Sequence, residues 1–231
     1  HAYIKDKYGR EIRNEKDLFD FAAGLQQATE MYIKAIVEQH IKKHNYKNIC
    51  LAGGVALNSV MTSKFYDWFD VDNVYVCPIP YDSGLAIGTA QLVWHQFMDN
   101  PRVTWDTKPT PYLGKQYDTS EIKKAIEQSR HRDRITTKQV IELLAQQKLV
   151  SAFHGGSESG RRALGNRSIL ADPRSDKMKG LINEKVKHRQ WFRPFAPSVL
   201  REHVNEWFDK DIDSPYMSFV LGIKKDKRSQ V

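Results

Sequence analysis

Two short apolar runs, each leading through a turn into a helical pattern, constrain the fold of this chain more than any other feature. The run NICLA at 48–52 opens onto a Gly-Gly pair, and residues 55–65 then read as helix. The run VYVC at 74–77 is stopped by prolines before a helical stretch at 83–91. Strands that alternate with helices in this way predict an α/β fold with a parallel or mixed sheet.

A long amphipathic helix is predicted ahead of the first run. Asn14 suits an N-cap, and the acidic Glu15 and Asp17 follow in the first turn, where the helix dipole favours negative charge. Apolar residues recur at helical spacing as far as Ile36, so the helix should end near the basic stretch 40–47.

The pattern lapses over residues 99–116, which contain three prolines and mark a domain boundary. Beyond it, helices are predicted over 121–129, 137–147 and 201–208, strands over 149–154 and 217–223, and an extended segment over 194–200.

Composition bounds the class of protein. The 231 residues include 36 Lys+Arg and 28 Asp+Glu, a net charge of +8 that suits an anionic ligand or a nucleic acid. No run approaches the roughly 18 to 20 apolar residues of a membrane span, and no secretion signal begins the chain. Cys50 and Cys77 lack disulfide-framework or metal-ligand spacing. We therefore expect a cytoplasmic protein with no membrane partner.

The Gly-Gly corner in LAGGVALN, residues 51–58, is the first candidate site. Glycines at such a corner let backbone N–H groups approach a phosphate, and a helix N-terminus would add partial positive charge. A tight turn without a ligand explains the octet equally well.

The segment PYDSG at 80–84 places Asp82 at the start of a helix, where a carboxylate can cap the helix or bind a metal. From the residues alone, capping is the favoured reading. His40 and His44 share a helix face, but the lysines between them favour a solvated surface over a metal site.

The most informative segment is HGGSESGRRALGNRSILADPR, residues 154–174, in which arginines alternate with glycines and small polar residues without matching acids. Guanidinium forks, hydroxyls and exposed backbone N–H groups together form an anion cradle, with a solvated basic patch as the alternative. A second basic segment, VKHRQWFRPFAPS, follows at 186–198. Its rings could stack on a single-stranded nucleic acid, but their apolar context predicts burial, and a small-molecule phosphate is preferred.

These motifs resemble the O-carbamoyltransferases related to nodulation and antibiotic-tailoring proteins. The resemblance runs through LAGGVALNSVMTSK, PYDSGLAIGTA, GGSESGRRALGNRSILADPR, NEKVKHRQWFRPFAPSVLREHVNEWF and SPYMSFV, in that order, from about residue 20 to 221. It implies that residues 1–100 are the second half of an actin/hexokinase-like carbamoyl-transfer domain. Residues 101–116 would then be a linker, and residues 117–231 part of a YrdC-like α/β domain.

The resemblance also implies a reaction and its residues. Carbamoyl phosphate and ATP would form carbamoyl-adenylate, and the carbamoyl group would pass to the hydroxyl of a small-molecule acceptor. The implied catalytic residues are Arg162 and Arg167, which would grip the phosphates, and His154, a candidate proton shuttle that backbone bonding could equally explain. The implied cofactor-binding residues are Gly53, Gly54, Asn58, Arg189, Arg193 and Ser198, and the implied ligand of iron or another divalent metal is Asp82.

Two departures from the family pattern affect these expectations. Arg161 stands where the family more often has proline. The family's metal-binding His-x-x-x-His would precede residue 1, and the end of the YrdC-like domain would follow residue 231. We therefore expect a fragment that does not complete the reaction alone, because His40 and His44 fall on the wrong helix to replace the missing pair. A non-catalytic nucleotide- or RNA-binding module and threonylcarbamoyl transfer on tRNA stay open, although no nucleic-acid partner is expected.

Overall fold

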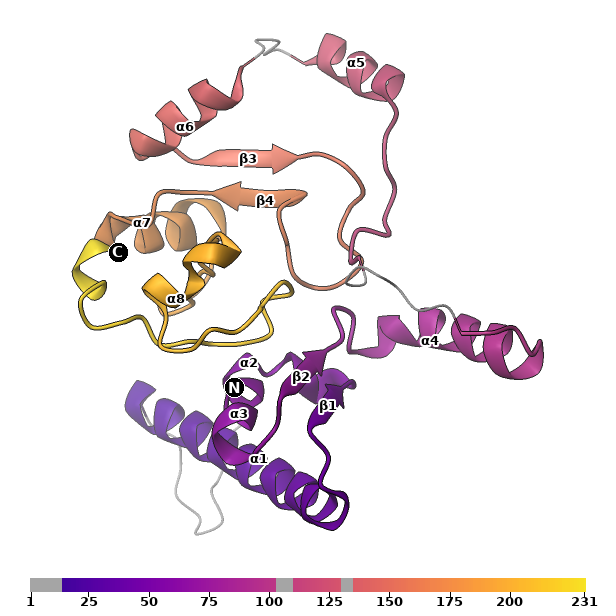
Figure 1. Cartoon of the computed structure of the whole chain (residues 1–231). Helices are drawn as coiled ribbons and strands as arrows, with labels where there is room; N and C mark the ends of the chain where they lie inside the picture. The colour runs from indigo at the N-terminus through magenta and orange to yellow at the C-terminus, as the bar shows by residue number, and fades with distance from the viewer. Residues whose placement is uncertain (1–13, 103–109, 130–134) are drawn as a thin grey trace. The chain divides into compact units, whose positions relative to one another are not determined.

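A computed structural model describes residues 14–102, 110–129 and 135–231 of the chain. Helices mix with short strands, which confirms the α/β class (Figure 1). The chain divides into two compact units. Unit 1 contains the described residues up to Cys50 together with Lys64–Tyr75, and unit 2 contains Leu51–Ser63 together with Val76–Val231.

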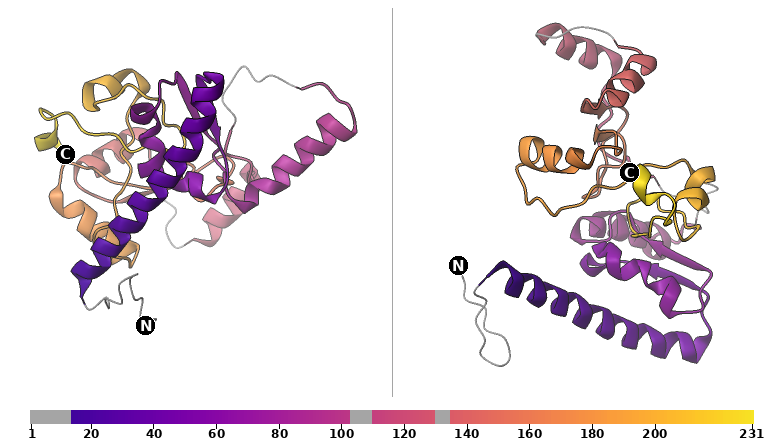
Figure 2. Two further views of the ribbon diagram at one scale, coloured as in Figure 1. Left: turned by 90° about the horizontal axis from the view of Figure 1, so that it is seen from below. Right: turned by 90° about the vertical axis from the view of Figure 1, so that its left-hand side faces the viewer.

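Unit 1 is dominated by the predicted long helix, α1 (Glu15–His44), which is uninterrupted in both views of Figure 2. Asn14 caps it as predicted, because its side-chain oxygen accepts a hydrogen bond of 2.9 Å from the backbone N–H of Asp17. The helix ends at Asn45, whose left-handed backbone (φ 51°) stops the helical path.

The apolar face of α1 is not covered by the described residues. The side chains of Leu25 and Tyr32 are 61% and 74% exposed, and the buried residue of this helix is the acidic Glu30. Periodicity therefore predicted the helix correctly, but not what covers it.

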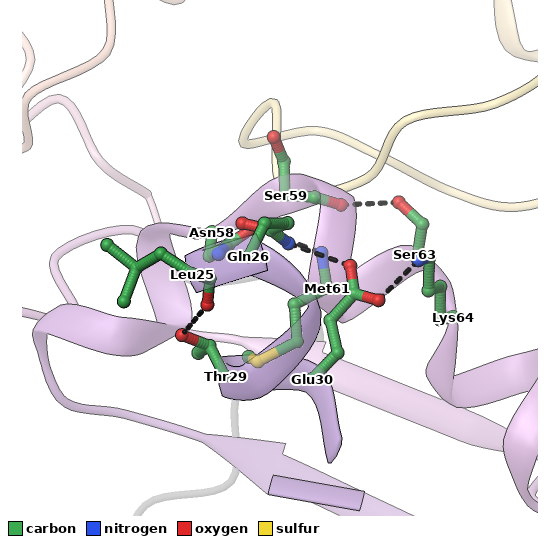
Figure 3. A network of polar contacts seen from close by, with 9 residues as sticks. All are labelled: Leu25, Gln26, Thr29, Glu30, Asn58, Ser59, Met61, Ser63 and Lys64. Atoms are coloured by element: carbon green, nitrogen blue, oxygen red, sulfur yellow. Dashed lines mark hydrogen bonds and ion pairs between the residues drawn. The ribbon is translucent and has the colours of Figure 1, made fainter. Parts of the chain in front are cut away.

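Glu30 joins α1 to the start of the short helix α3 (Phe65–Trp68) within unit 1. Its carboxylate accepts hydrogen bonds from the side chains of Gln26 and Lys64 (Figure 3). Burial alone would raise the pKa of Glu30, but these two donors outweigh it and lower that pKa.

The two apolar runs form the predicted strands β1 (Asn48–Leu51) and β2 (Asn73–Val76), which pair in a two-stranded sheet. The N–H of Asn73 donates to the carbonyl of Lys47, and the N–H of Cys77 donates to the carbonyl of Leu51. Partners that advance together along both strands indicate a parallel pair.

Unit 2 holds the remaining elements. Its helices are α2 (Ser59–Ser63), α4 (Leu85–Leu92), α5 (Thr119–Gln128), α6 (Thr137–Ala145), α7 (Asp176–Leu181) and α8 (Val204–Trp207). A π-helical turn extends α4 over Val93–Phe97 and another extends α7 over Ile182–Val186. Capping boxes at Asp118 and Thr136 fix the starts of α5 and α6, close to the predicted positions. Strand β3 (Val150–Phe153) pairs antiparallel with β4 (Arg167–Leu170).

Two predicted elements differ from the structure, and one observed strand was not predicted. The predicted helix over 55–65 is instead a 3₁₀ turn at Gly54–Leu57 followed by the short helix α2. The two are separated because Asn58 has a non-helical backbone and caps the start of α2. The strand over 217–223 is absent, since the carbonyl of Ser218 and the N–H of Val220 bond instead to the hydroxyls of Thr62 and Ser63 in α2. Strand β4 was not predicted, because its residues lie inside the arginine-rich motif.

The buried apolar side chains gather in each unit separately. In unit 1 they are Phe65, Phe69 and Val74, and in unit 2 they are Ala56, Met61, Val76, Ile79, Met178, Ile182, Val204 and Tyr216. Cys50 and Cys77 are free thiols, as expected. Within the described ranges, no helix combines the length and apolar character needed to cross a membrane.

Candidate anion-binding site

The arginine loop, residues 154–166, connects β3 to β4 in unit 2. Phe153 and Arg167 are paired across the two strands, and the N–H of His154 donates to the carbonyl of Asn166 at 3.1 Å. The loop is therefore closed at its base by the antiparallel ladder, and its two ends lie side by side (Figure 1).

Glu158 organises the interior of this loop. One oxygen of its carboxylate accepts the backbone N–H groups of Leu164, Asn166 and Arg167, at 2.7, 3.0 and 3.3 Å. Burial raises the pKa of Glu158, but these backbone donors outweigh it and the net pKa is lowered. Three backbone N–H groups of the arginine-rich motif are thus already occupied by a carboxylate of the chain itself, so the prediction that the motif lacks matching acids was wrong.

Two glycines of the loop are required by close chain packing. A Cβ on Gly156 would lie 2.7 Å from the backbone oxygen of Tyr112, and one on Gly160 would lie 2.5 Å from that of Pro78. Gly155 and Gly165 instead have positive φ angles of 55° and 117°, which favour glycine for conformational reasons. These four glycines therefore shape the loop whether or not it binds a phosphate.

The described end of the predicted linker is attached to the same loop. The N–H of Gly114 donates to the carbonyl of Ser157 at 2.9 Å, and the N–H of Ser159 donates to Pro111 at 2.8 Å. The hydroxyl of Tyr112 donates to the carbonyl of Leu164 at 2.7 Å. This strap, residues 110–114, restricts the loop from outside while Glu158 restricts it from inside.

Arg167 is held rigidly at the start of β4. Its Nη1 donates to the carbonyls of His154 and Asn166 at 2.7 and 2.9 Å, and its Nη2 donates to Gly155 at 3.2 Å. The guanidinium carbon lies 3.6 Å from the ring centroid of Phe153, a cation–π contact. Its Nε–H has no acceptor among the described residues. The side chain of His154 is exposed.

Two further arginines connect the loop to the earlier motifs within unit 2. The Nη2 of Arg162 donates to the carbonyl of Leu57 at 3.3 Å, next to the predicted binding residue Asn58. The guanidinium of Arg161 lies 4.5 Å from the ring centroid of Tyr81, next to Asp82. Three motifs that are far apart in the sequence, at 51–58, 80–84 and 154–167, therefore meet in one compact unit.

The Gly-Gly corner differs from the predicted phosphate corner. Only a four-residue 3₁₀ turn follows Gly53, so no long helix directs its dipole at the glycines. Gly53 needs its positive φ of 91°, whereas a Cβ on Gly54 would meet nothing within 4 Å and its φ is ordinary. The side-chain oxygen of Asn58 accepts the N–H of Met61 at 3.1 Å and so caps α2.

Asp82 lies in the 3₁₀ turn Asp82–Gly84 before α4 and is exposed. The N-cap position of this turn is Tyr81 and that of α4 is Gly84, so Asp82 caps neither, contrary to the capping prediction. Among the described residues, no group of three or more His, Cys, Asp or Glu side chains is arranged to hold a metal ion. Asp82 could supply one carboxylate, but the described residues do not form a metal centre by themselves.

Arg174 is neutralised within the motif that was predicted to bind anions. Its side chain forms an ion pair with Asp172, whose hydrogen bonds with that side chain and with the Arg174 N–H lower the pKa of the carboxyl to about 2. Arg174 therefore contributes little positive charge to an external ligand, unlike the arginines that lack an acidic partner.

The second basic segment, residues 186–198, is organised by Asn183, which sequence reasoning missed. The buried Asn183 accepts the Nε–H of Arg189 at 2.7 Å and donates to the carbonyls of Trp191 and Arg193 at 3.2 and 2.9 Å. Burial and the positive charge of Arg193 lower the pKa of Arg189. The available signal in the sequence was the position of this polar residue, three residues before the basic segment that starts at 186.

The aromatic rings of this segment are exposed, so the prediction that they are buried was wrong. Trp191, Phe192 and Phe195 are 67%, 46% and 40% exposed. The rings of Trp191 and Phe192 lie edge to face with their centroids 5.9 Å apart, and the guanidinium of Arg189 lies 4.7 Å from the ring centroid of Phe195. Ser198, the remaining predicted binding residue, is also exposed on this segment.

An open apolar groove lies on α4 and the π-helical turn that follows it. Its lining residues are Leu85, Ala86, Thr89, Ala90, Val93, Trp94 and Met98. None of the predicted site residues lines this groove, so the candidate site is the arginine-bearing surface and not the groove.

A loop that carries several arginines therefore meets two earlier turns within one compact unit of an α/β protein. Comparison with known proteins then gives the family. The chain belongs to the carbamoyltransferase family: the description "Carbamoyltransferase N-terminus" matches residues 3–91 and "Carbamoyltransferase C-terminus" matches residues 141–231.

Curated relatives agree with this assignment. An uncharacterized protein of Synechocystis is 37% identical over 218 residues, covering 90% of this chain and 35% of that protein. Nodulation protein NolO of Bradyrhizobium diazoefficiens is 35% identical over 221 residues, covering 90% of this chain and 39% of that protein. Nodulation protein NolNO of Sinorhizobium fredii is 35% identical over 223 residues, covering 91% and 32%. The chain thus spans about a third of the length of these relatives.

Proposed function

We propose that the full-length protein is an ATP-dependent O-carbamoyltransferase. The observation that carries the proposal is the meeting of the arginine loop with residues 51–58 and 80–84 in one unit. Arg162 and Arg167 would bind the phosphates of carbamoyl phosphate or ATP, and Arg189 and Arg193 would add a second cationic group. The actin/hexokinase-like and YrdC-like identities of the two domains, and their boundaries at 1–100 and 117–231, belong to this proposal.

The proposed reaction has three steps. Water cleaves the phosphorus–oxygen bond of carbamoyl phosphate, which releases phosphate and carbamate. A carbamate oxygen then bonds to the α-phosphorus of ATP as pyrophosphate leaves, giving carbamoyl-adenylate. The acceptor oxygen finally bonds to the carbamoyl carbon, AMP leaves, and the hydroxyl proton passes to a base, for which the exposed imidazole of His154 is our candidate.

Fixed cations are the main contribution of a protein to phosphate chemistry of this kind, because negative charge accumulates on the oxygens in the transition state. The rigid support of Arg167 by backbone carbonyls favours such a role, since a guanidinium held in place needs no reorganisation during the reaction. A divalent metal at Asp82 would need ligands beyond the described residues, and the proposal includes no step that depends on one.

The test is release of pyrophosphate by the full-length protein in the presence of ATP, with and without carbamoyl phosphate. Arg167→Ala should reduce the carbamoyl-phosphate-dependent rate by about 10²-fold, the loss typical of one preorganised transition-state donor. Arg174→Ala is the matched control, because its charge is already paired with Asp172, and it should retain activity. Undiminished release by Arg167→Ala would contradict the proposal.

A second candidate is a non-catalytic module that binds single-stranded RNA. The exposed Trp191 and Phe192 beside Arg189 and Arg193 favour it, because stacking rings and cations together bind single strands. Affinity for an oligonucleotide that falls steeply with salt and is lost in Trp191→Ala would support this candidate. Carbamoyl-phosphate-dependent pyrophosphate release would instead support the enzyme.

A further inference from the structure

Asn183 is a buried polar residue that lies just before the second basic segment. It is 1% exposed and lies in the π-helical turn that ends α7. A buried amide is costly unless its donors and acceptor are satisfied, so its hydrogen bonds indicate what it holds in place. Here both ends of the amide are used, and the side-chain group that it contacts is the guanidinium of Arg189.

The amide fixes the path of the chain as well as one arginine. Its nitrogen donates to the carbonyls of Trp191 and Arg193, which brings the backbone of the segment back against the helix end. The backbone N–H of Arg189 also returns to the carbonyl of Asn183 at 3.0 Å, after a left-handed turn at His188 with φ 46°. One buried side chain therefore fixes both the start and the end of the bend that carries Arg189 and Arg193.

This bend holds two positive charges without an acid to balance them. Neither Arg189 nor Arg193 pairs with a carboxylate among the residues that the structure describes, in contrast to Arg174 and Arg201. Burial lowers the pKa of Arg189 most, and repulsion from the positive charge of Arg193 lowers it further. An anion bound between them would remove the repulsion, and phosphate oxygens suit guanidinium donors.

We infer that Asn183 is a positioning residue for a phosphate subsite formed by Arg189 and Arg193. The inference rests on the proposed function, which it deepens: Asn183 does not touch the ligand, but it sets the direction of the Arg189 guanidinium through Nε. The Nη2 of Arg189 donates to the carbonyl of Pro194 at 3.4 Å, which leaves Nη1 and one N–H of Nη2 without an acceptor among the described residues to meet the phosphate.

Isothermal titration of this chain with inorganic phosphate and with carbamoyl phosphate tests the inference. Arg189→Ala and Asn183→Ala should each weaken binding by about tenfold or more, the ratio expected when one charged hydrogen bond to the ligand is lost. Both changes remove the hydrogen bond between Asn183 and Arg189, and Asn183→Ala also frees the carbonyls of Trp191 and Arg193. The double variant should therefore bind no more weakly than the weaker single variant. Met178→Ala, which empties a buried position in the preceding helix, should keep the wild-type affinity.

The outcomes separate the inference from the proposed function. If Arg189→Ala weakens binding and Asn183→Ala does not, or if the two losses add, the positioning role is overturned while the anion site stands. If the wild-type chain binds neither probe, the anion subsite and the positioning role are both overturned, and pyrophosphate release by the full-length protein still tests the enzyme. Asn183→Ser, a smaller polar replacement, is measured in the same way should the alanine variant fail to fold.

Discussion

Removing the carboxylate of Glu158 should open the arginine loop. The side chain accepts three backbone N–H groups, of which those of Leu164 and Asn166 are close, at 2.7 and 3.0 Å. Hydrogen bonds to a charged group contribute about 1.5–3 kcal/mol each, and partial rehydration of the freed donors offsets some of the sum. We therefore expect Glu158→Ala to lower the free energy of unfolding by about 2–4 kcal/mol.

Glu158→Gln tests the contribution of the negative charge, because glutamine has nearly the same shape as glutamate. Its amide oxygen can still accept the same N–H groups, but without the negative charge, so the loss should be about 1 kcal/mol. The assay is urea unfolding followed by circular dichroism. With a slope of about 3 kcal/mol per molar urea, a loss of 3 kcal/mol lowers the midpoint by about 1 M. Glu127→Ala, an exposed acid on α5, is the matched control and should leave the midpoint unchanged.

The pH dependence gives an independent check. The folded-state pKa of Glu158 is lowered, so its stabilising contribution is present above the unfolded value of about 4.3 and is lost as the pH falls through the lower folded pKa. The difference between wild type and Glu158→Ala should therefore be full at pH 7 and shrink towards pH 3. A midpoint for Glu158→Ala equal to that of the Glu127 control at pH 7, or a difference that grows on acidification, would refute this account of the loop.

Three further changes test other contacts. Asp172→Asn should lower the melting temperature at pH 7 by removing the partner of Arg174. Since the pKa of Asp172 is about 2, the difference in melting temperature between wild type and variant should persist below pH 3.8, the ordinary pKa of an aspartate, and vanish near pH 2. An equal melting temperature at pH 7 would count against the ion pair. Gly156→Ala, whose Cβ would meet a backbone oxygen at 2.7 Å, should cost about 1–3 kcal/mol in urea unfolding, whereas Gly54→Ala, with open space, should cost clearly less; equal losses would contradict the packing argument. Thr62→Val should cost about 1–3 kcal/mol by the same assay, because it removes the buried hydroxyl that donates to the part-buried carbonyl of Ser218. An unchanged midpoint would show that the 218–220 segment does not depend on that bond.

Local signals in the sequence were enough to locate most helices and three of the strands. The cap at Asn14, the capping boxes at Asp118 and Thr136, and the apolar runs of β1 and β3 act over a few residues, so they can be read without a structure. The same holds for the family, because long motifs such as RRALGNRSILADPR are specific as strings of residues.

What surrounds each functional residue was decided by tertiary structure. The sequence supplied arginines, glycines and a glutamate in one stretch, but only the folded loop shows that Glu158 occupies three of its backbone N–H groups. Likewise Arg167 and Arg174 look alike in the sequence, yet one rests on backbone carbonyls and the other is neutralised by Asp172. Hydrogen-bond partners and burial depend on segments that are distant in the chain, and local propensity carries no information about them. The sequence therefore determined which chemical groups are present, and the tertiary structure decided which of them remain available to a ligand.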